Sequence, residues 1–142
     1  MSRSGYNDYD DIDNWALIKF RGQVASAIRG RRGHAFLTEL RDALDAMPEK
    51  RLISHDLQTA DGEVCTLGAI GVRRGVPLEG IDPDDERHHD HLAKAFDIAP
   101  QLVQEIEWEN DEAAYHETPE GRWQRMRRWV ERAIAKAEDA DQ

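Results

Sequence analysis

The sequence predicts a mainly α-helical protein, a compact bundle of about five or six helices with one short β-hairpin around residues 57–65. Apolar side chains recur every three or four positions along most of the chain, which is the spacing of one helix face. Glycine and proline separate these periodic segments, as expected where helices begin and end. A length of 142 residues suits one hydrophobic core.

We therefore expect a single helical domain over residues 13–137. Residues 1–12 are polar and acidic and lack apolar periodicity, so they are predicted to be a disordered tail, and residues 138–142 a frayed C-terminus.

Two helices are predicted in the first third of the chain, over about residues 14–29 and 33–47, with Pro48 ending the second. Because Gly30 and Gly33 bracket the short connection between them, we expect these helices to form an antiparallel hairpin.

The middle of the chain changes character. Asp61-Gly62 is a strong β-hairpin turn signal, which predicts short strands on either side. A short helix over residues 66–74 follows, and its glycines Gly68 and Gly71 would let a neighbouring backbone approach closely.

Three further helix starts are marked by proline. Pro83 follows the capping residue Asp82, Pro100 follows a short break, and Pro119 follows the cap Thr118. The last helix is expected to extend to about residue 136.

The charge is unevenly distributed within a net charge of −10. Residues 76–121 contain fourteen acidic and two basic side chains, whereas residues 14–38 contain no carboxylate. The two blocks would either neutralise one another by packing or be offered to different partners.

No run approaches the roughly 20 apolar residues of a membrane span, and the N-terminus has no secretory pattern. With a single cysteine, Cys65, no internal disulfide can form. We expect a cytoplasmic protein that does not contact membranes.

Residues 91–110 have the spacing of a helix-turn-helix motif, but sequence-specific DNA binding is not expected. The second helix would present only uncharged and acidic side chains. The acidic ones repel the DNA phosphates, and the uncharged ones offer them no positive charge. These side chains are Gln101, Gln104, Glu105, Glu107 and Glu109.

Histidines at positions 88, 89 and 91 lie among acidic residues and raise the question of a metal site. His88 and His91 share a helix face, but no ligand from another element can be named for them. The interpretation favoured by the sequence is a solvated acidic helix face, with no metal and no cofactor.

Cys65 would gain reactivity if it lay at a helix N-terminus, with His34, His55 or His116 as its base. The sequence places none of these histidines beside it. A small buried apolar residue is the simpler interpretation.

The segment RGRRG at residues 29–33 could bind phosphate through Arg29, Arg31 and Arg32, although arginine is also common at a helix C-terminus. Trp108 and Trp129 are candidates for a partly exposed contact surface.

Several segments together resemble a group of small proteins, without an assigned activity, that tailed phages and prophages of proteobacteria encode. The segments are DNWALI at 13–18, RGQVASAIRGRRG at 21–33, ALDAMPEKRLI at 43–53, DGEVCTLGAIGVRRG at 61–75, FDIAPQLVQEIEWENDE at 96–112 and ETPEGRWQRMRRWV at 117–130. The resemblance spans about residues 13–135. It implies a bacterial host cytoplasm and transfers no role to any residue.

The function predicted on these grounds is that of a phage accessory protein, a non-enzymatic binding module that acts on a host or phage protein. The alternatives are a structural virion component, an acidic mimic of nucleic acid that inhibits a host protein, and an enzyme dependent on Cys65. The predicted binding residues are Trp108, Glu105, Glu109, Asp111, Arg29, Arg31 and Arg32.

Overall fold

The structure is a computed structural model that describes residues 14–82, 85 and 87–140. Within these residues it contains six helices, so the mainly α-helical class is confirmed. The helices are α1 (Asn14–Arg29), α2 (Arg31–Ala46), α3 (Thr66–Arg74), α4 (Arg87–Phe96), α5 (Pro100–Glu112) and α6 (Pro119–Ala140). The predicted tail over residues 1–12 lies outside the described residues.

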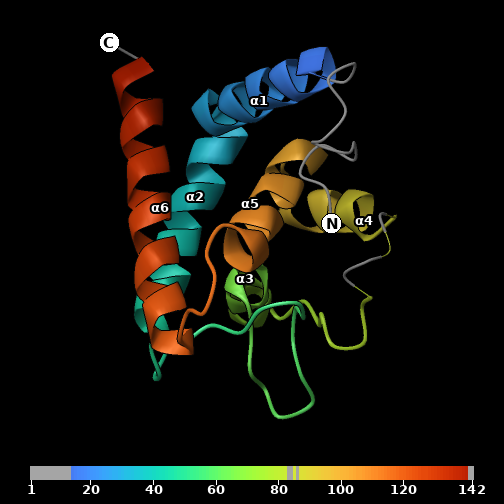
Figure 1. Ribbon diagram of the computed structural model, residues 1–142, viewed down its shortest axis with the longest axis vertical. Helices are drawn as coiled ribbons and strands as arrows, with labels where there is room; N and C mark the ends of the chain where they lie inside the picture. Colours follow the sequence, from blue (N-terminus) through green and yellow to red (C-terminus); the bar gives the residue numbers. More distant parts are fainter. Residues whose placement is uncertain (1–13, 83–84, 86, 141–142) are drawn as a thin grey trace.

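Helix α5 occupies the centre of the bundle (Figure 1). It packs against α1, α3, α4 and α6, while α2 and α6 run side by side along one flank. The central position of α5 explains why its apolar residues Leu102, Val103 and Ile106 are fully buried. They join one core with Phe36 and Leu40 of α2.

The predicted antiparallel hairpin of the first two helices is wrong. Helix α1 lies across the end of α2, and the two meet at a corner (Figure 1). Only Gly30 separates the helices, because α2 begins at Arg31 and not at Gly33, and one residue is too short a connection to bring two helices back alongside each other. A side chain at Gly33 would overlap the carbonyl oxygen of Ala27, so glycine permits the close corner.

The predicted β-hairpin is also wrong, since the described residues contain no strand. The segment around residues 57–65 retains one isolated antiparallel bridge, between Gln58 and Val64. The turn itself is present, with Gly62 at φ 86°. The ladder ends there because Cys65, whose backbone N–H donates to the Leu57 carbonyl at 3.1 Å, is followed directly by α3 at Thr66.

Several predicted helix ends agree with the structure. Helix α3 ends before Gly75, which adopts the left-handed conformation. Helix α5 begins at Pro100. Helix α6 begins at Pro119, and the Thr118 hydroxyl accepts a hydrogen bond from the backbone N–H of Gly121 at 2.9 Å.

The start of α4 differs from the prediction. The helix begins at Arg87 rather than directly after Asp82, and Asp85 has no helical conformation. The Asp85 carboxylate accepts a hydrogen bond from the backbone N–H of Arg87 at 3.0 Å and so caps the helix. The predicted first helical residue, Pro83, lies outside the described residues.

None of the helices in the described part of the chain combines the length and the apolar character that a membrane span requires.

Candidate functional site

Polar side chains of α5 project toward three different parts of the molecule. Glu105 and Glu109 line a cavity beside α1 and α6. Glu107 lies against α4, where it meets two histidines. Asn110 reaches the start of α3. The central helix therefore supplies each of the polar sites described below.

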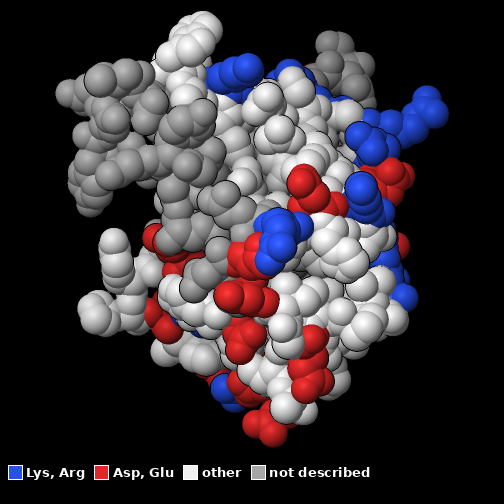
Figure 2. Space-filling view, turned by 90° about the vertical axis from the view of Figure 1, so that its right-hand side faces the viewer, with Lys and Arg blue, Asp and Glu red and all other residues white. Residues whose placement is uncertain are grey.

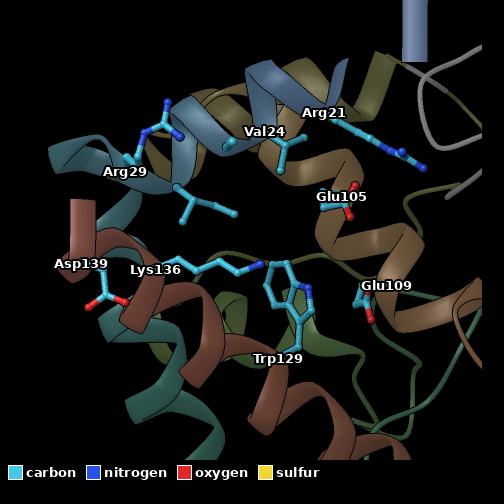
Figure 3. A pocket seen from close by; sticks show the side chains of 10 residues that line it. Arg21, Val24, Arg29, Glu105, Glu109, Trp129, Lys136 and Asp139 are labelled. Atoms are coloured by element: carbon cyan, nitrogen blue, oxygen red, sulfur yellow. The ribbon is translucent and has the colours of Figure 1, made fainter. Parts of the chain in front are cut away.

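A cavity of about 610 Å³ lies between α1, α5 and α6. We call it the α1 groove. It is lined by Arg21, Val24, Ala25, Ile28, Arg29, Glu105, Glu109, Trp129, Lys136 and Asp139. In Figure 3 the α1 side chains form one wall, the two glutamates project from α5, and the Trp129 ring lies opposite on α6. A cavity of this size accommodates a few side chains of a binding partner.

The accessible charge of the α1 groove is mainly basic. Arg21, Arg29 and Lys136 are exposed. Glu105 is only 4% exposed, and the Glu109 carboxylate lies 3.4 Å from the Arg125 guanidinium. Asp139 is the one exposed acidic residue of the lining, so the acidic residues present less charge to solvent than the three basic ones.

The outer surface of α1 extends the groove. Ile18 is 52% exposed and Trp15 is 74% exposed. Ile18 shares one helix face with the groove residues Ala25 and Arg29, because spacings of seven and eleven residues return to the same side of a helix. Figure 2 shows Lys and Arg gathered along the upper part of the molecule, the level of α1 in Figure 1, with most Asp and Glu below them.

A second site is formed by His88, His89 and Glu107, which we call the His–Glu cluster. The side chains of these residues are 4%, 5% and 2% exposed. His88 Nε2 lies 2.8 Å and His89 Nε2 lies 3.0 Å from the same oxygen, Glu107 Oε2. The interpretation of a solvated acidic helix face is therefore wrong for these two histidines, although His91 is exposed.

The charges within the His–Glu cluster support one another. Burial works against ionisation of His88, but hydrogen bonds to Glu107 and to the Asp85 carbonyl outweigh it, and the pKa of His88 lies above its ordinary value. Burial likewise acts against the Glu107 carboxylate, but the hydrogen bonds from His88 and His89 hold the pKa of Glu107 below its ordinary value. An ionised carboxylate is thus stable in the core.

Two buried atoms of the cluster have no hydrogen-bond partner among the described residues. They are Glu107 Oε1 and His89 Nδ1. Buried polar atoms are normally paired, so these two indicate that the cluster has unused binding capacity.

A third polar group, which sequence reasoning missed, ties α5 to α3. Asn110 Oδ1 accepts hydrogen bonds from the backbone N–H and the hydroxyl of Thr66, at 3.1 and 2.7 Å. The Asn110 amide donates to the Ile53 carbonyl and to Asp111 at 3.0 and 2.7 Å. Asn110 therefore caps α3 from a different helix.

The structure separates the predicted binding residues into groups. It brings Glu105, Glu109 and Arg29 together in the α1 groove. Asp111 is half-buried and accepts a hydrogen bond from the backbone N–H of His55 at 3.0 Å, away from that groove. Trp108 is also half-buried.

The two remaining arginines, Arg31 and Arg32, are exposed in the first turn of α2 and not in a loop. Arg32 pairs with Asp97 at 3.1 Å, which joins the basic N-terminal block to the acidic one.

Cys65 is 3% exposed and directly precedes α3. Burial raises the pKa of the Cys65 thiol to about 12, and the nearby carboxylates of Asp111 and Glu107 act in the same direction. A protonated, enclosed thiol is a poor nucleophile. The geometry thus argues against an enzyme built on Cys65.

Helices α4 and α5 pack together as the helix-turn-helix spacing indicates, with Asp97 at φ 56° in the turn. The would-be recognition helix α5 is central, so it cannot enter a DNA groove. Much of the acidic block is also withdrawn from the surface: Glu105 and Glu107 are buried, and Glu117 bonds Arg125.

Comparisons with protein-family models, with curated proteins and with solved structures return no match.

Proposed function

We propose that this chain is a non-enzymatic binding module that engages a partner protein through the α1 groove and the adjoining exposed face of α1. The observation that carries the proposal is the cavity of about 610 Å³ beside exposed Trp15 and Ile18. Exposed aromatic and aliphatic side chains next to a cavity are typical of protein contact surfaces.

The partner segment is expected to carry apolar side chains flanked by carboxylates. Val24, Ile28 and Trp129 provide an apolar lining for the former. Arg21, Arg29 and the rest of the carboxylate-free block over residues 14–38 attract the latter. A nucleic acid fits less well, because the apolar lining of the groove and the exposed side chain of Ile18 offer its phosphates no partner.

The resemblance to phage and prophage proteins supports a host or phage protein as this partner and a bacterial cytoplasm as the place of contact. The buried thiol of Cys65 and the withdrawn carboxylates of the acidic block weigh against the enzyme and the nucleic-acid mimic. Mass spectrometry of purified particles tests the virion alternative, which requires the protein to be present in every particle.

The test uses the full chain as bait in lysate of a proteobacterial host, followed by affinity measurement with the purified partner. Ile18→Asp should weaken binding about tenfold or more, the effect of losing about 1.4 kcal/mol. The matched control is Val72→Asp on α3, because Val72 is 59% exposed against 52% for Ile18. It should leave affinity unchanged.

Two further variants test, one each, the contribution of the basic charge and that of the predicted contact residue Trp108 to partner binding. Arg29→Glu should slow association and reduce its dependence on salt. Trp108→Ala should have little effect if the α1 groove is the contact. No stoichiometric partner, or a partner bound equally by wild type and Ile18→Asp, would refute the proposed function.

A further inference from the structure

We propose that the His–Glu cluster is a binding site for a divalent transition metal ion, Zn²⁺ in the first place, with His88, His89 and Glu107 as ligands. This site is separate from the α1 groove and does not depend on the proposed function.

The donor atoms already converge. One ligand atom from each of the three residues lies within 4.8 Å of the others. Two ligands of a tetrahedral zinc ion at 2.0–2.1 Å are about 3.3 Å apart. The nitrogens of His88 and His89 lie 2.8 and 3.0 Å from Glu107 Oε2. The two nitrogens would therefore have to move away from Oε2 by only about half an ångström, and release the shared protons, to admit the ion.

Hydrogen bonding alone leaves the cluster incomplete. Glu107 is 2% exposed, yet its second oxygen, Oε1, has no partner among the described residues. A buried carboxylate held only for structure normally has both oxygens paired. Coordination would give Oε1 a role, because a carboxylate binds a metal ion through one oxygen or both.

The support around His88 is also that of a metal ligand. His88 Nδ1 lies against the backbone carbonyl of Asp85, which fixes the proton on that nitrogen and turns Nε2 toward Glu107. Metal-bound histidines usually donate their other N–H to a carbonyl or carboxylate in this way. Asp85 is in turn held by Arg87 through hydrogen bonds of 3.0 and 2.9 Å.

The ligand types select the metal. Two imidazoles and one carboxylate suit Zn²⁺ and its first-row neighbours better than Mg²⁺ or Ca²⁺, which prefer oxygen ligands alone. Three protein ligands leave one position of a tetrahedral ion for water or another small molecule.

The test is metal binding by the full chain after chelator treatment, measured by calorimetry with Zn²⁺ and by visible absorption with Co²⁺. We expect one equivalent of Zn²⁺ and the strong absorption of four-coordinate Co²⁺. Glu107→Gln preserves a hydrogen-bond acceptor but removes the anionic ligand, so Zn²⁺ affinity should fall about a hundred-fold or more. The matched control His91→Gln, on the exposed side of the same helix, should bind as wild type does.

A measurement on the wild-type chain covers the case in which Glu107→Gln does not fold. In long-range ¹H–¹⁵N spectra, Zn²⁺ should shift the ring resonances of His88 and His89 and leave those of His91 in place. Substoichiometric binding, equal Zn²⁺ affinity of folded Glu107→Gln and wild type, or shifts confined to exposed histidines would overturn the proposal.

Discussion

Replacement of Asn110 by alanine is expected to be among the most destabilising single changes in this chain. Asn110 is 2% exposed, and its amide makes four hydrogen bonds with Thr66, Ile53 and Asp111. The alanine variant would leave the Thr66 N–H, the Thr66 hydroxyl and the Ile53 carbonyl without this partner. Thr66 is fully buried, so water cannot simply replace the amide.

The magnitude follows from these three groups. Each buried polar group that loses its partner costs about 1–3 kcal/mol, and the lower end applies here because Ile53 is only half-buried. We therefore expect a loss of about 3 kcal/mol, a large part of the roughly 5–15 kcal/mol that stabilises a domain. At an m-value of about 2 kcal/mol/M, the urea midpoint would fall by about 1.5 M.

The assay is urea unfolding followed by far-ultraviolet circular dichroism. Thr66→Val is the matched control, since it removes only the hydroxyl bond at 2.7 Å and keeps the backbone bond at 3.1 Å. It should cost about 1 kcal/mol. A loss below about 1 kcal/mol for Asn110→Ala, or an equal loss for both variants, would contradict the role assigned to Asn110.

Three further predictions concern glycine, thiol and acid groups. Gly68→Ala should destabilise the protein by about 2–4 kcal/mol, because the new methyl group would overlap the Leu57 carbonyl. Gly22→Ala has open space around it and should stabilise α1 by about 0.5–1 kcal/mol. Equal urea midpoints for the two variants would contradict this prediction. Cys65 should react with iodoacetamide at neutral pH only at the rate of unfolding, since burial raises its pKa to about 12; a burst of labelling in the native protein would count against it. Burial also raises the pKa of Asp111 in the folded protein above the ordinary value of 3.8, so the folded state binds this proton more tightly than the unfolded state. The resulting stabilisation is full below pH 3.8 and is lost as the pH rises through the pKa of the folded state. Asp111→Asn should accordingly gain stability over wild type toward neutral pH, and a gain that appears only in acid would refute the assignment.

The helix ends that sequence predicted best are those set by local chemistry. Proline fixes φ and lacks an N–H at Pro100 and Pro119, and glycine adopts the left-handed conformation at little cost at Gly75. These effects do not depend on what packs nearby, and the structure confirms all three boundaries. The corner at Gly30 depends instead on where α2 begins, because two glycines three residues apart leave the exact boundary open. The lost strands around residues 57–65 depend on how that segment packs against the helices.

The candidate sites were harder to predict for the same reason. Glu105, Glu107 and Glu109 form one alternating acidic run, and only the packing of α5 decides that Glu107 meets the histidines. A signal did exist: His88 and His89 precede the buried residues Leu92 and Ala93 by four positions, so they continue the apolar face of α4. The identity of their partner required the fold.

The pairing of α2 with α6 has a consequence for biosynthesis. Leu37, Leu40 and Leu44 of α2 are fully buried, yet the helix that runs beside α2 is the last of the six along the chain. During translation these leucines leave the ribosome long before α6, which covers them, has been synthesised. A nonsense codon after position 118 should therefore yield a fragment that aggregates or is degraded.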